Sequence, residues 1–392
     1  RYLQVKSFEP DRADIAPVPA APHLALRGLA MRGDPSAVPR GWRILVGTFD
    51  WEGSFSHGAV LISPEFEAIH FWPLDETDIG EAKAGPAHRR VPHGFALLPD
   101  AAAVVAFDGG MSLQRIGHCG EAQWQIAGAY HHVVTLADDG RHVWSIRDDV
   151  FEEVDVETGE VTRSVDVLDI IAANPQIDIL EIRRLHHNDI VNNSRDRDDP
   201  FMHDPFHFND VEPLPHAIAD AFPQFKPGDL MVSSRSLNLV MVFDPDSREV
   251  KWWRVGAWKR QHDPDWLPSG KIAVFDNQMN REWSRIVEID PQTFEVDVTV
   301  DGERHDFYTR IRGKHQILTG GGHLMVSSQQ ARAIELGANG EVALEFLNLN
   351  GDDKNLGYTL TDYMFVPEAA FKAPLPCEPV PAASAGERRA RG

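Results

Sequence analysis

Positive charge is scarce in this sequence of 392 residues. Lysine and arginine together number 38 against 60 aspartates and glutamates, which gives a formal net charge of −22. A protein that binds nucleic acid needs clustered lysine and arginine to neutralise phosphates. The charge therefore argues against a nucleic-acid partner, while a local basic patch can still bind a small anion.

Long apolar runs and cysteines are also rare. No stretch approaches the roughly 18 apolar residues of a membrane span. The chain begins at Arg1, so a signal or membrane anchor upstream of that residue is compatible with the sequence. Cys119 and Cys377 lie far apart, and Cys377 sits in a segment rich in proline and alanine. They can pair in an oxidising compartment, but nothing in their spacing demands it, and we interpret them as free thiols.

Glycine and proline, in contrast, are plentiful at 30 and 27 residues, which suits an all-β fold with many turns. Six segments repeat one pattern: a short apolar strand, a turn with Asp, Pro or Gly, and a second short strand. Apolar and polar residues alternate on both sides of each turn, which predicts a β-hairpin. The six hairpins begin at Gly58, Ser112, Phe151, Leu239, Arg285 and Ala331.

Another pair of strands precedes five of these hairpins, and its first strand opens on a histidine. These histidines are His93, His132, His207, His262 and His315. A strand pair plus a hairpin makes a four-stranded unit of about 40–55 residues, the size of a propeller blade. The first hairpin lacks such a strand, while the strand that begins at Tyr358 lacks a hairpin. We therefore predict a six-bladed β-propeller over residues 41–372, closed by a C-terminal strand that completes blade one.

Three segments fall outside this repeat. We expect residues 1–40 to wrap the outside or to lead from an anchor, and residues 373–392 to be a disordered tail. Residues 166–206 form an insertion before the fourth blade, with a helix-like run and a polar stretch. The metal-ligand candidates in that stretch are His186, His187, His203 and the run Asp196 to Asp199. Their spacing is not that of a zinc motif.

The innermost strands of a propeller run along its central axis, so residues at their starts lie close together. The five blade-opening histidines should share one register and line a central channel, although any one of them alone can equally well satisfy backbone groups at a turn. Grouped imidazoles can bind a metal ion, act as nucleophile or general base, or bind an anion when protonated. No Cys or His pairs have the usual spacing of a metal site, so we expect no metal.

Several motifs resemble the bacterial arylsulfate sulfotransferases. They are QHDPDWLPSGKIAVFDN (Gln261 to Asn277), HFNDVEPLP (His207 to Pro215), DLMVSSRSLNLVMVFDPDSREVKWWRV (Asp229 to Val255), SRIVEID (Ser284 to Asp290), DFYT (Asp306 to Thr309) and the closing YTLTDYMFVP. The resemblance covers blades four to six well and blades two and three loosely. That family is a six-bladed propeller, in agreement with the repeat count.

The resemblance implies transfer of a sulfuryl group from an aryl sulfate to a phenol through a sulfohistidine, with no cofactor. It assigns the nucleophile to His262 of the QH motif. The other catalytic residues that it implies are His207, Asn209, Arg235 and His132. An arginine fork, an amide and an imidazolium can stabilise charge that develops on the sulfuryl oxygens. A histidine nucleophile also predicts ping-pong kinetics.

We expect four more residues to contact the substrate: His131, Asp263, Trp266 and Tyr308. A carboxylate at Asp263 either orients His262 or repels a sulfate. Trp266 can stack on an aryl group, although packing between blades is the commoner role of such a ring. The same alternatives apply to Trp252, Trp253, Trp258 and Phe206.

The chain departs from the family in some respects. The better-known members carry a separate N-terminal β-domain, which residues 1–40 are too few to supply. An alternative interpretation is a relative with different chemistry or a binding or assembly module, which Asp263, the acidic surface and the insertion favour. The resemblance sets His262 and His207 apart as chemical and implies that His93 and His315 are structural. We expect a periplasmic protein, free or membrane-anchored, and leave open whether it forms a homo-oligomer.

Overall fold

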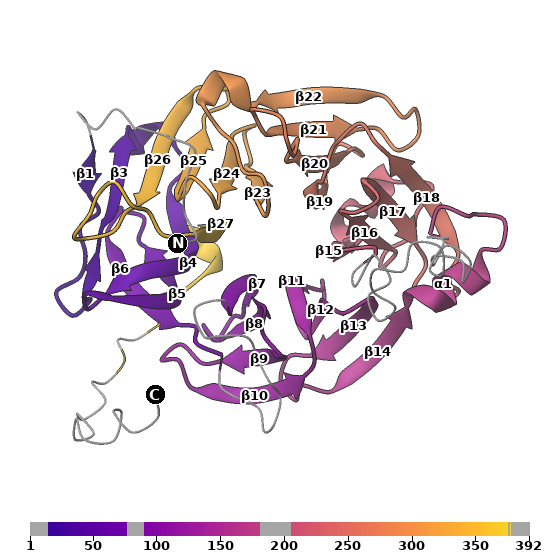
Figure 1. Cartoon of the computed structure of the whole chain (residues 1–392), viewed down its shortest axis with the longest axis horizontal. Coiled ribbons are helices and arrows are strands. Elements are labelled where there is room, and N and C mark those ends of the chain that lie inside the picture. The colour runs from indigo at the N-terminus through magenta and orange to yellow at the C-terminus, as the bar shows by residue number, and fades with distance from the viewer. Residues whose placement is uncertain (1–14, 77–89, 181–204, 375–376, 378–392) are drawn as a thin grey trace, which may run out of the picture.

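The chain folds into a ring of six antiparallel sheets around a central axis (Figure 1). The computed structural model describes residues 15–76, 90–180, 205–374 and 377. Each sheet is one blade, and in blades two to five the strands follow one another from the axis to the outside in the order of the chain. The predicted six-bladed β-propeller is therefore confirmed.

Blades two to five each consist of four consecutive strands. Blade two contains β7 (Val91–Leu97), β8 (Ala103–Asp108), β9 (Ser112–Ile116) and β10 (Ala122–Ala127). Blade three contains β11 (Tyr130–Leu136), β12 (His142–Arg147), β13 (Val150–Asp155) and β14 (Val161–Asp166). Blade four contains β15 (Phe208–Pro213), β16 (Leu230–Ser234), β17 (Leu239–Phe243) and β18 (Val250–Val255). Blade five contains β19 (His262–Trp266), β20 (Ile272–Asp276), β21 (Arg285–Ile289) and β22 (Val296–Asp301).

Blade one is built from both ends of the chain. Its consecutive strands are β4 (Gly41–Trp51), β5 (Ser54–Ile62) and β6 (Ala68–Pro73). The C-terminal β27 (Leu360–Pro367) pairs antiparallel with β4 on the side of the axis, as predicted. A short β2 (Leu26–Arg27) pairs with the far end of β4.

Blade six carries part of the N-terminal segment on its outer edge. Its four own strands are β23 (His315–Ile317), β24 (His323–Ser327), β25 (Arg332–Leu336) and β26 (Val342–Asn348). Outside them, β3 (Leu29–Gly33) pairs with β26, and β1 (Ala16–Pro17) pairs with β3. The described part of the N-terminal extension thus covers what would otherwise be the open edge of this blade.

Helices are short. α1 (Val167–Ala173) follows β14, begins at the capping side chain of Asp166, and ends before Pro175, so the helix-like run of the insertion is interrupted there. The 3₁₀ turns are η1 (Pro35–Ala37), η3 (His216–Ala221), η4 (Gly302–His305) and η5 (Glu368–Ala370). Over the ranges that the structure describes, no helix is both long and apolar enough to cross a membrane. The metal-ligand candidates of the insertion, residues 186–203, lie outside the described residues.

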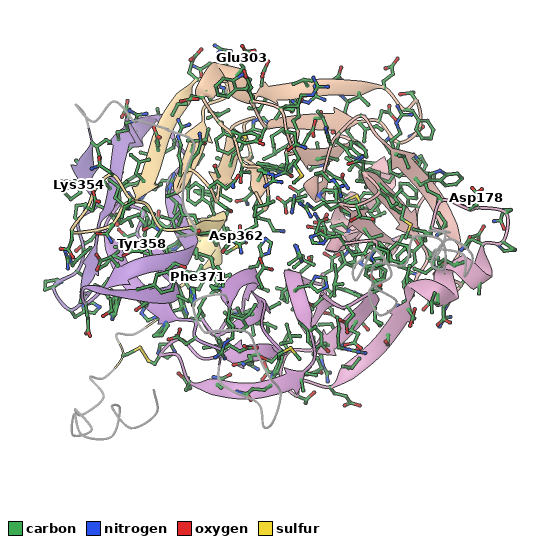
Figure 2. The ribbon with its side chains drawn as sticks, viewed as in Figure 1. Asp178, Glu303, Lys354, Tyr358, Asp362 and Phe371 are labelled. Carbon is green, nitrogen blue, oxygen red and sulfur yellow. A yellow bond between two sulfur atoms is a disulfide. The ribbon has the colours of Figure 1, made fainter. Side chains whose placement is uncertain are left out.

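Cys119 and Cys377 form a disulfide, so their interpretation as free thiols is wrong. They are separated by 258 positions in the sequence. However, β27 returns the C-terminal segment to blade one, next to the turn between β9 and β10 that contains Cys119. Figure 2 shows the bond between this turn and the C-terminal segment. Spacing along the chain gave no hint of the pair because ring closure creates their proximity.

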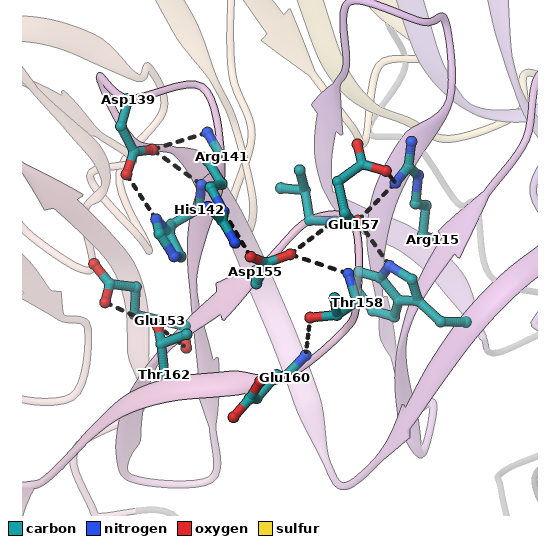
Figure 3. Close-up of polar contacts among 12 residues, drawn as sticks. Arg115, Asp139, Arg141, His142, Glu153, Asp155, Glu157, Thr158, Glu160 and Thr162 are labelled. Atoms are coloured by element: carbon teal, nitrogen blue, oxygen red, sulfur yellow. Dashed lines mark hydrogen bonds and ion pairs between the residues drawn. The ribbon is translucent and has the colours of Figure 1, made fainter.

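An aspartate recurs where the third strand of a blade turns into the fourth. The carboxylates of Asp155, Asp244 and Asp290 each accept backbone N–H groups from the two residues at the tip of the turn. In blade three, Asp155 Oδ1 accepts from Glu157 at 2.9 Å and from Thr158 at 3.0 Å (Figure 3). These contacts satisfy N–H groups that the ladder leaves unpaired, which explains the aspartate in the repeat.

We expect Asp155→Ala to lower the free energy of unfolding by about 1–3 kcal/mol at pH 7, because it leaves two N–H groups without their acceptor. The hydrogen bond from Arg141 and those from the turn lower the pKa of Asp155 to about 2. A carboxylate with a lowered pKa stabilises the fold above its unfolded pKa of about 4 and loses this effect as the pH falls toward 2. The difference in the free energy of unfolding between Asp155→Ala and the wild type should therefore become smaller in acid. Urea unfolding at a series of pH values measures this difference.

Glu157→Ala is the matched control in the same turn. Its side chain is 69% exposed and pairs with Arg115, so the change should cost no more than about 0.5 kcal/mol. Equal losses from the two variants would contradict the assigned role of Asp155.

Candidate active site

Five histidine rings meet at the axis of the propeller, and His132 lies at their centre. Its ring centroid is 4.9 Å from that of His93, 5.0 Å from His207 and 6.3 Å from His262. The neighbouring His131 is 4.8 Å away. Since these residues come from blades two, three, four and five, the predicted convergence holds for four of the five blade-opening histidines. We call these five rings the histidine cluster.

The positions of these residues can be compared between blades, because the residue after each inner strand of blades two to five donates its N–H to a carbonyl oxygen at the start of the second strand. The last residues of those strands are Leu97, Leu136, Pro213 and Trp266. Four positions before them lie His93, His132, Asn209 and His262. Three histidines and one asparagine therefore share a register.

The expectation that all five blade-opening histidines share this register is wrong for two of them. His207 precedes β15 and lies two positions before Asn209, whereas His315 lies only two positions before the end of β23. A β-bulge adds a residue to the start of β7, β15 and β19, and the sequence motif does not reveal it. His315 accordingly lies outside the histidine cluster, with its ring 6.4 Å from that of Phe275.

His262 is held as a neutral ring in one tautomer. It is buried, and its Nδ1 lies 2.7 Å from Asn277 Oδ1. Asn277 Nδ2 donates to the carbonyl oxygens of Thr309 at 3.0 Å and Arg312 at 2.6 Å, which fixes the amide orientation. An amide oxygen can only accept, so His262 carries its proton on Nδ1 and its lone pair on Nε2. Burial lowers the pKa of His262 well below its usual value, and the charge of Arg235 acts in the same direction.

His93 is oriented in the same way by a carboxylate. Its Nδ1 lies 2.9 Å from Asp108 Oδ1, and Arg312 donates to Asp108 Oδ2 at 2.8 Å. Although burial raises the pKa of Asp108, His93 and Arg312 hold it well below its usual value. Burial lowers the pKa of His93. His93 is therefore a neutral donor to an ionised carboxylate.

His132 receives its orientation from the adjacent histidine. His131 Nε2 donates to the carbonyl oxygen of Asp148 at 3.1 Å, so a neutral His131 has an accepting Nδ1. His132 Nδ1 lies 2.8 Å from that atom and donates to it, which leaves the lone pair of His132 on Nε2. Burial lowers the pKa of His132 well below its usual value. Both His131 and His132 thus belong to the cluster, as predicted from the sequence.

Blade four places an amide and a guanidinium where blades two and five have a histidine and its acceptor. Arg235 lies five positions after the first residue of its second strand, as Asp108 and Asn277 do in their blades. Asn209 is buried, its Nδ2 donates to the carbonyl oxygen of Gln261 at 2.7 Å, and its Oδ1 has no hydrogen-bond partner among the described residues. Blade four therefore brings polar groups for a ligand to the histidine cluster.

The glutamine of the QH motif is a structural link between blades. Gln261 is fully buried, and its Nε2 donates to Ser233 Oγ and to Leu239 O, both at 2.9 Å. It fixes the start of β19, and hence His262, to β16, which ends one residue before Arg235. The QH motif and the SSR motif, which are far apart in the sequence, are thus in contact.

Three residues in this region have left-handed backbone conformations. The φ angles are 64° at His132, 48° at His207 and 51° at Asp263. Such conformations cost about 1–3 kcal/mol each for residues other than glycine, and they concentrate at functional sites. Together with the bulges, they turn these side chains toward the axis.

The expected aromatic contacts to a substrate lie elsewhere. Trp266 is 6% exposed and packs between blades four and five, with its ring 4.8 Å from Phe222 and 5.5 Å from Phe225. Trp252, Trp258 and Phe206 are likewise buried, and Trp253 is exposed on the outermost strand β18. No hydrogen bond or ring contact of the described residues joins Tyr308 to the histidine cluster. The packing role is the one that the structure supports for Trp266.

Asp263 neither orients His262 nor faces the cluster as a free charge. Its Oδ1 lies 2.6 Å from Lys314 Nζ, and its Oδ2 accepts the backbone N–H of His315 at 2.6 Å. Sequence reasoning missed four residues that contact predicted site residues or one another here: Lys314, Asn277, Asp108 and Arg312. A signal existed for Asn277 alone, which ends the QH motif.

We expect nitrogen NMR of histidine-labelled protein to find His262 with its proton on Nδ1. Asn277→Leu should shift the proton to Nε2, because the acceptor is lost. Asn277→Asp keeps the acceptor and should raise the pKa of His262 by about one unit or more, because a carboxylate stabilises the imidazolium. His262→Gln assigns the signal, and an unchanged tautomer in Asn277→Leu would refute the positioning role.

Comparison with known proteins agrees with this architecture. The sequence profile of the arylsulfotransferase (ASST) family matches residues 95–348. No curated protein matches the sequence. A protein of unknown function from Bacteroides caccae is 13% identical with a TM-score of 0.53, over 84% of this chain and 100% of that one. A functionally unknown protein from Desulfotomaculum acetoxidans is 10% identical with a TM-score of 0.43, over 81% and 83%. The first likeness supports the fold alone.

Proposed function

Because the chain belongs to the arylsulfotransferase family, we propose that it transfers a sulfuryl group from an aryl sulfate to a phenol, with His262 as nucleophile. The observation that carries this proposal is the fixed, neutral state of His262, with its proton on Nδ1 and its lone pair on Nε2. Only a neutral imidazole can attack sulfur, and its orientation decides which nitrogen does so.

In the first step, His262 Nε2 forms a bond to sulfur while the bond from sulfur to the aryl oxygen breaks. The electron pair of that bond leaves on the phenolate. Nδ1 keeps its proton because its partner Asn277 is an amide that cannot accept one. The sulfohistidine is therefore a cationic ring, which is a better leaving group than a neutral one.

In the second step, the oxygen of the acceptor phenol attacks sulfur and the bond to His262 breaks. The phenol must lose its proton, and His132 is placed to take it, since its lone pair is on Nε2 and its ring lies 6.3 Å from that of His262. In this proposal His207, Arg235 and Asn209 donate to the sulfuryl oxygens, where charge develops in both steps.

Incubation with 4-nitrophenyl sulfate and phenol should release nitrophenol with ping-pong kinetics, which absorbance measures directly. His262→Gln should lower the rate by at least about a thousandfold, because no other group replaces the nucleophile. His70→Gln is the control, since His70 is a buried histidine of blade one whose Nε2 donates to the carbonyl oxygen of His118 at 2.8 Å. Its rate should stay within about twofold of wild type. Undiminished turnover in His262→Gln, or none with any of a broad panel of aryl sulfates, would refute the proposal.

We further infer that the protein works in an oxidising compartment such as the periplasm. The support is the disulfide between Cys119 and Cys377, because disulfides persist outside the reducing cytosol. The bond ties the segment behind the closing strand to blade two, so its reduction should weaken the closure of the ring.

Protein isolated from the periplasm of a bacterial host should contain no thiol that reacts with an alkylating reagent under denaturing conditions. Cys377→Ser should lower the free energy of unfolding by about 2–4 kcal/mol. Reduction of the wild type should have the same effect, and reduction of Cys377→Ser should have none. Two reactive thiols in the exported protein would contradict this inference.

A further inference from the structure

A group of five carboxyls, three of them buried and two partly exposed, lies beside the histidine cluster at the axis. Its members are Asp210, Glu212, Asp263, Asp265 and Asp362. They come from blades four, five and one, and Figure 2 labels Asp362 beside the axis. Burial and the neighbouring carboxyls raise the pKa of Asp210 and that of Asp362 to about 7. The charge of Lys314 acts in the opposite direction and offsets only part of this effect.

Two cationic side chains of the described residues contact this group. Lys314 Nζ lies 2.6 Å from Asp263 Oδ1 and 3.3 Å from Asp210 Oδ2. His315 Nδ1 lies 2.9 Å from Asp265 Oδ2 and 3.7 Å from Asp263 Oδ2. Five carboxyls thus face one ammonium and one imidazole, and the raised pKa values of Asp210 and Asp362 indicate that part of the group avoids a net negative charge only by holding protons.

The side chain of His315 is a second, independent reason to expect a ligand beside this group of carboxyls. This side chain is fully buried. Nδ1 forms an ion pair with Asp265 Oδ2 at 2.9 Å and lies 3.7 Å from Asp263 Oδ2, while Nε2 has no hydrogen-bond partner among the described residues. A buried imidazole nitrogen without a partner is unusual, because buried polar atoms are nearly always paired.

We propose that Asp263, Asp265 and His315 bind one divalent transition-metal ion, with Zn²⁺ and Mn²⁺ as the fitting class. One ligand atom from each of the three residues lies within 4.8 Å of the others. Ligand bonds of about 2.0–2.2 Å place neighbouring ligand atoms about 3.3–3.6 Å apart in a tetrahedral site. The distances of 2.9 Å and 3.7 Å from His315 Nδ1 to the two carboxylates bracket that range. An imidazole with carboxylates favours these ions over Mg²⁺ and Ca²⁺, which prefer oxygen ligands alone.

The ion would join blade five to blade six at the axis and supply the positive charge that the carboxyl group lacks. The backbone N–H of His315 already orients Asp263 at 2.6 Å, as a supporting contact of a metal ligand does. This site is distinct from the nucleophile, because His262 is bonded to Asn277 and takes no part in it.

A second group, His93, Asp108 and His132, also has ligand atoms within 4.8 Å of one another. It is less suited to a cation, because Arg312 already donates to Asp108 and the Nδ1 atoms of both histidines are engaged in hydrogen bonds. It also belongs to the histidine cluster that the proposed transfer uses. Zn²⁺ binding by the variants His93→Gln and Asp265→Asn distinguishes the two positions.

The full chain, stripped of metal with a chelator, is titrated calorimetrically with Zn²⁺ and with Mn²⁺, and with Mg²⁺ as the comparison ion. We expect one equivalent of Zn²⁺ to bind saturably and to raise the Tm, and Mg²⁺ to bind more weakly. Asp265→Asn and His315→Gln should each weaken Zn²⁺ binding by about tenfold or more. Asp362→Asn is the matched control, because it changes a carboxyl of the same group outside the three ligands, and its Kd should stay within about threefold of wild type.

Anomalous scattering from crystals of the wild type grown with Zn²⁺ gives an answer that does not depend on the folding of any variant. A peak between Asp265 and His315 is expected. The proposal is overturned by the absence of saturable Zn²⁺ binding, by a peak elsewhere, or by a Kd that changes in His93→Gln and not in Asp265→Asn. Because Zn²⁺ binding is measured without a sulfate donor, its outcome does not depend on whether the protein carries out the proposed sulfuryl transfer.

Discussion

The pairing of β27 with β4 is the contact on which the rest of the molecule depends. It joins the two ends of the chain over the register from Leu360 and Gly47 to Pro367 and Gly41. Behind it, Arg43 is fully buried and donates through Nη2 to Glu335 of blade six at 3.0 Å, while Tyr363 of β27 donates to the same carboxylate. Because breaking a buried ion pair costs about 3–5 kcal/mol, strand closure and the contact between blades one and six stabilise each other. Without this closure, the inner strands would not face one axis.

Closure brings the inner strands together, and local backbone geometry decides which side chains meet. The bulges in β7, β15 and β19 and the left-handed residues at the axis put an equivalent position of each blade on the inner side. Two positions of each blade then act together: one on the first strand and one just beyond the second. In blade five they hold His262 and Asn277, and in blade four they hold Asn209 and Arg235. The repeat thus places His262 and its orienting amide beside the amide and guanidinium of blade four.

Sequence reasoning predicts the features that follow from alternation and repetition. The six hairpins and the strand from Tyr358 that closes the ring were predictable, since each is a local pattern of apolar residues. The convergence of His132 and His262 followed from their place at the start of inner strands. The register of His315 did not follow, because His315 lies only two positions before the end of β23, whereas His132 and His262 lie four positions before the ends of their strands. The state of His262 also required the structure, since Asn277 is fixed by carbonyl oxygens of a loop beyond it.

The carboxyl of Asp263 illustrates how context reverses an expectation from sequence. From the sequence alone, a carboxylate next to His262, the predicted nucleophile, suggests repulsion of a sulfate. In the structure Lys314 Nζ pairs with Asp263 Oδ1 at 2.6 Å. This lysine comes from blade six, so no motif near Asp263 in the sequence predicts the pair. Burial lowers the pKa of Lys314, but the carboxyls of Asp263, Asp210 and Asp362 raise it well above its usual value, so the ammonium is firmly charged. The histidine cluster and the acidic group can therefore lie side by side at one axis. The charge next to His262 is set by contacts between blades and not by its neighbours in the chain.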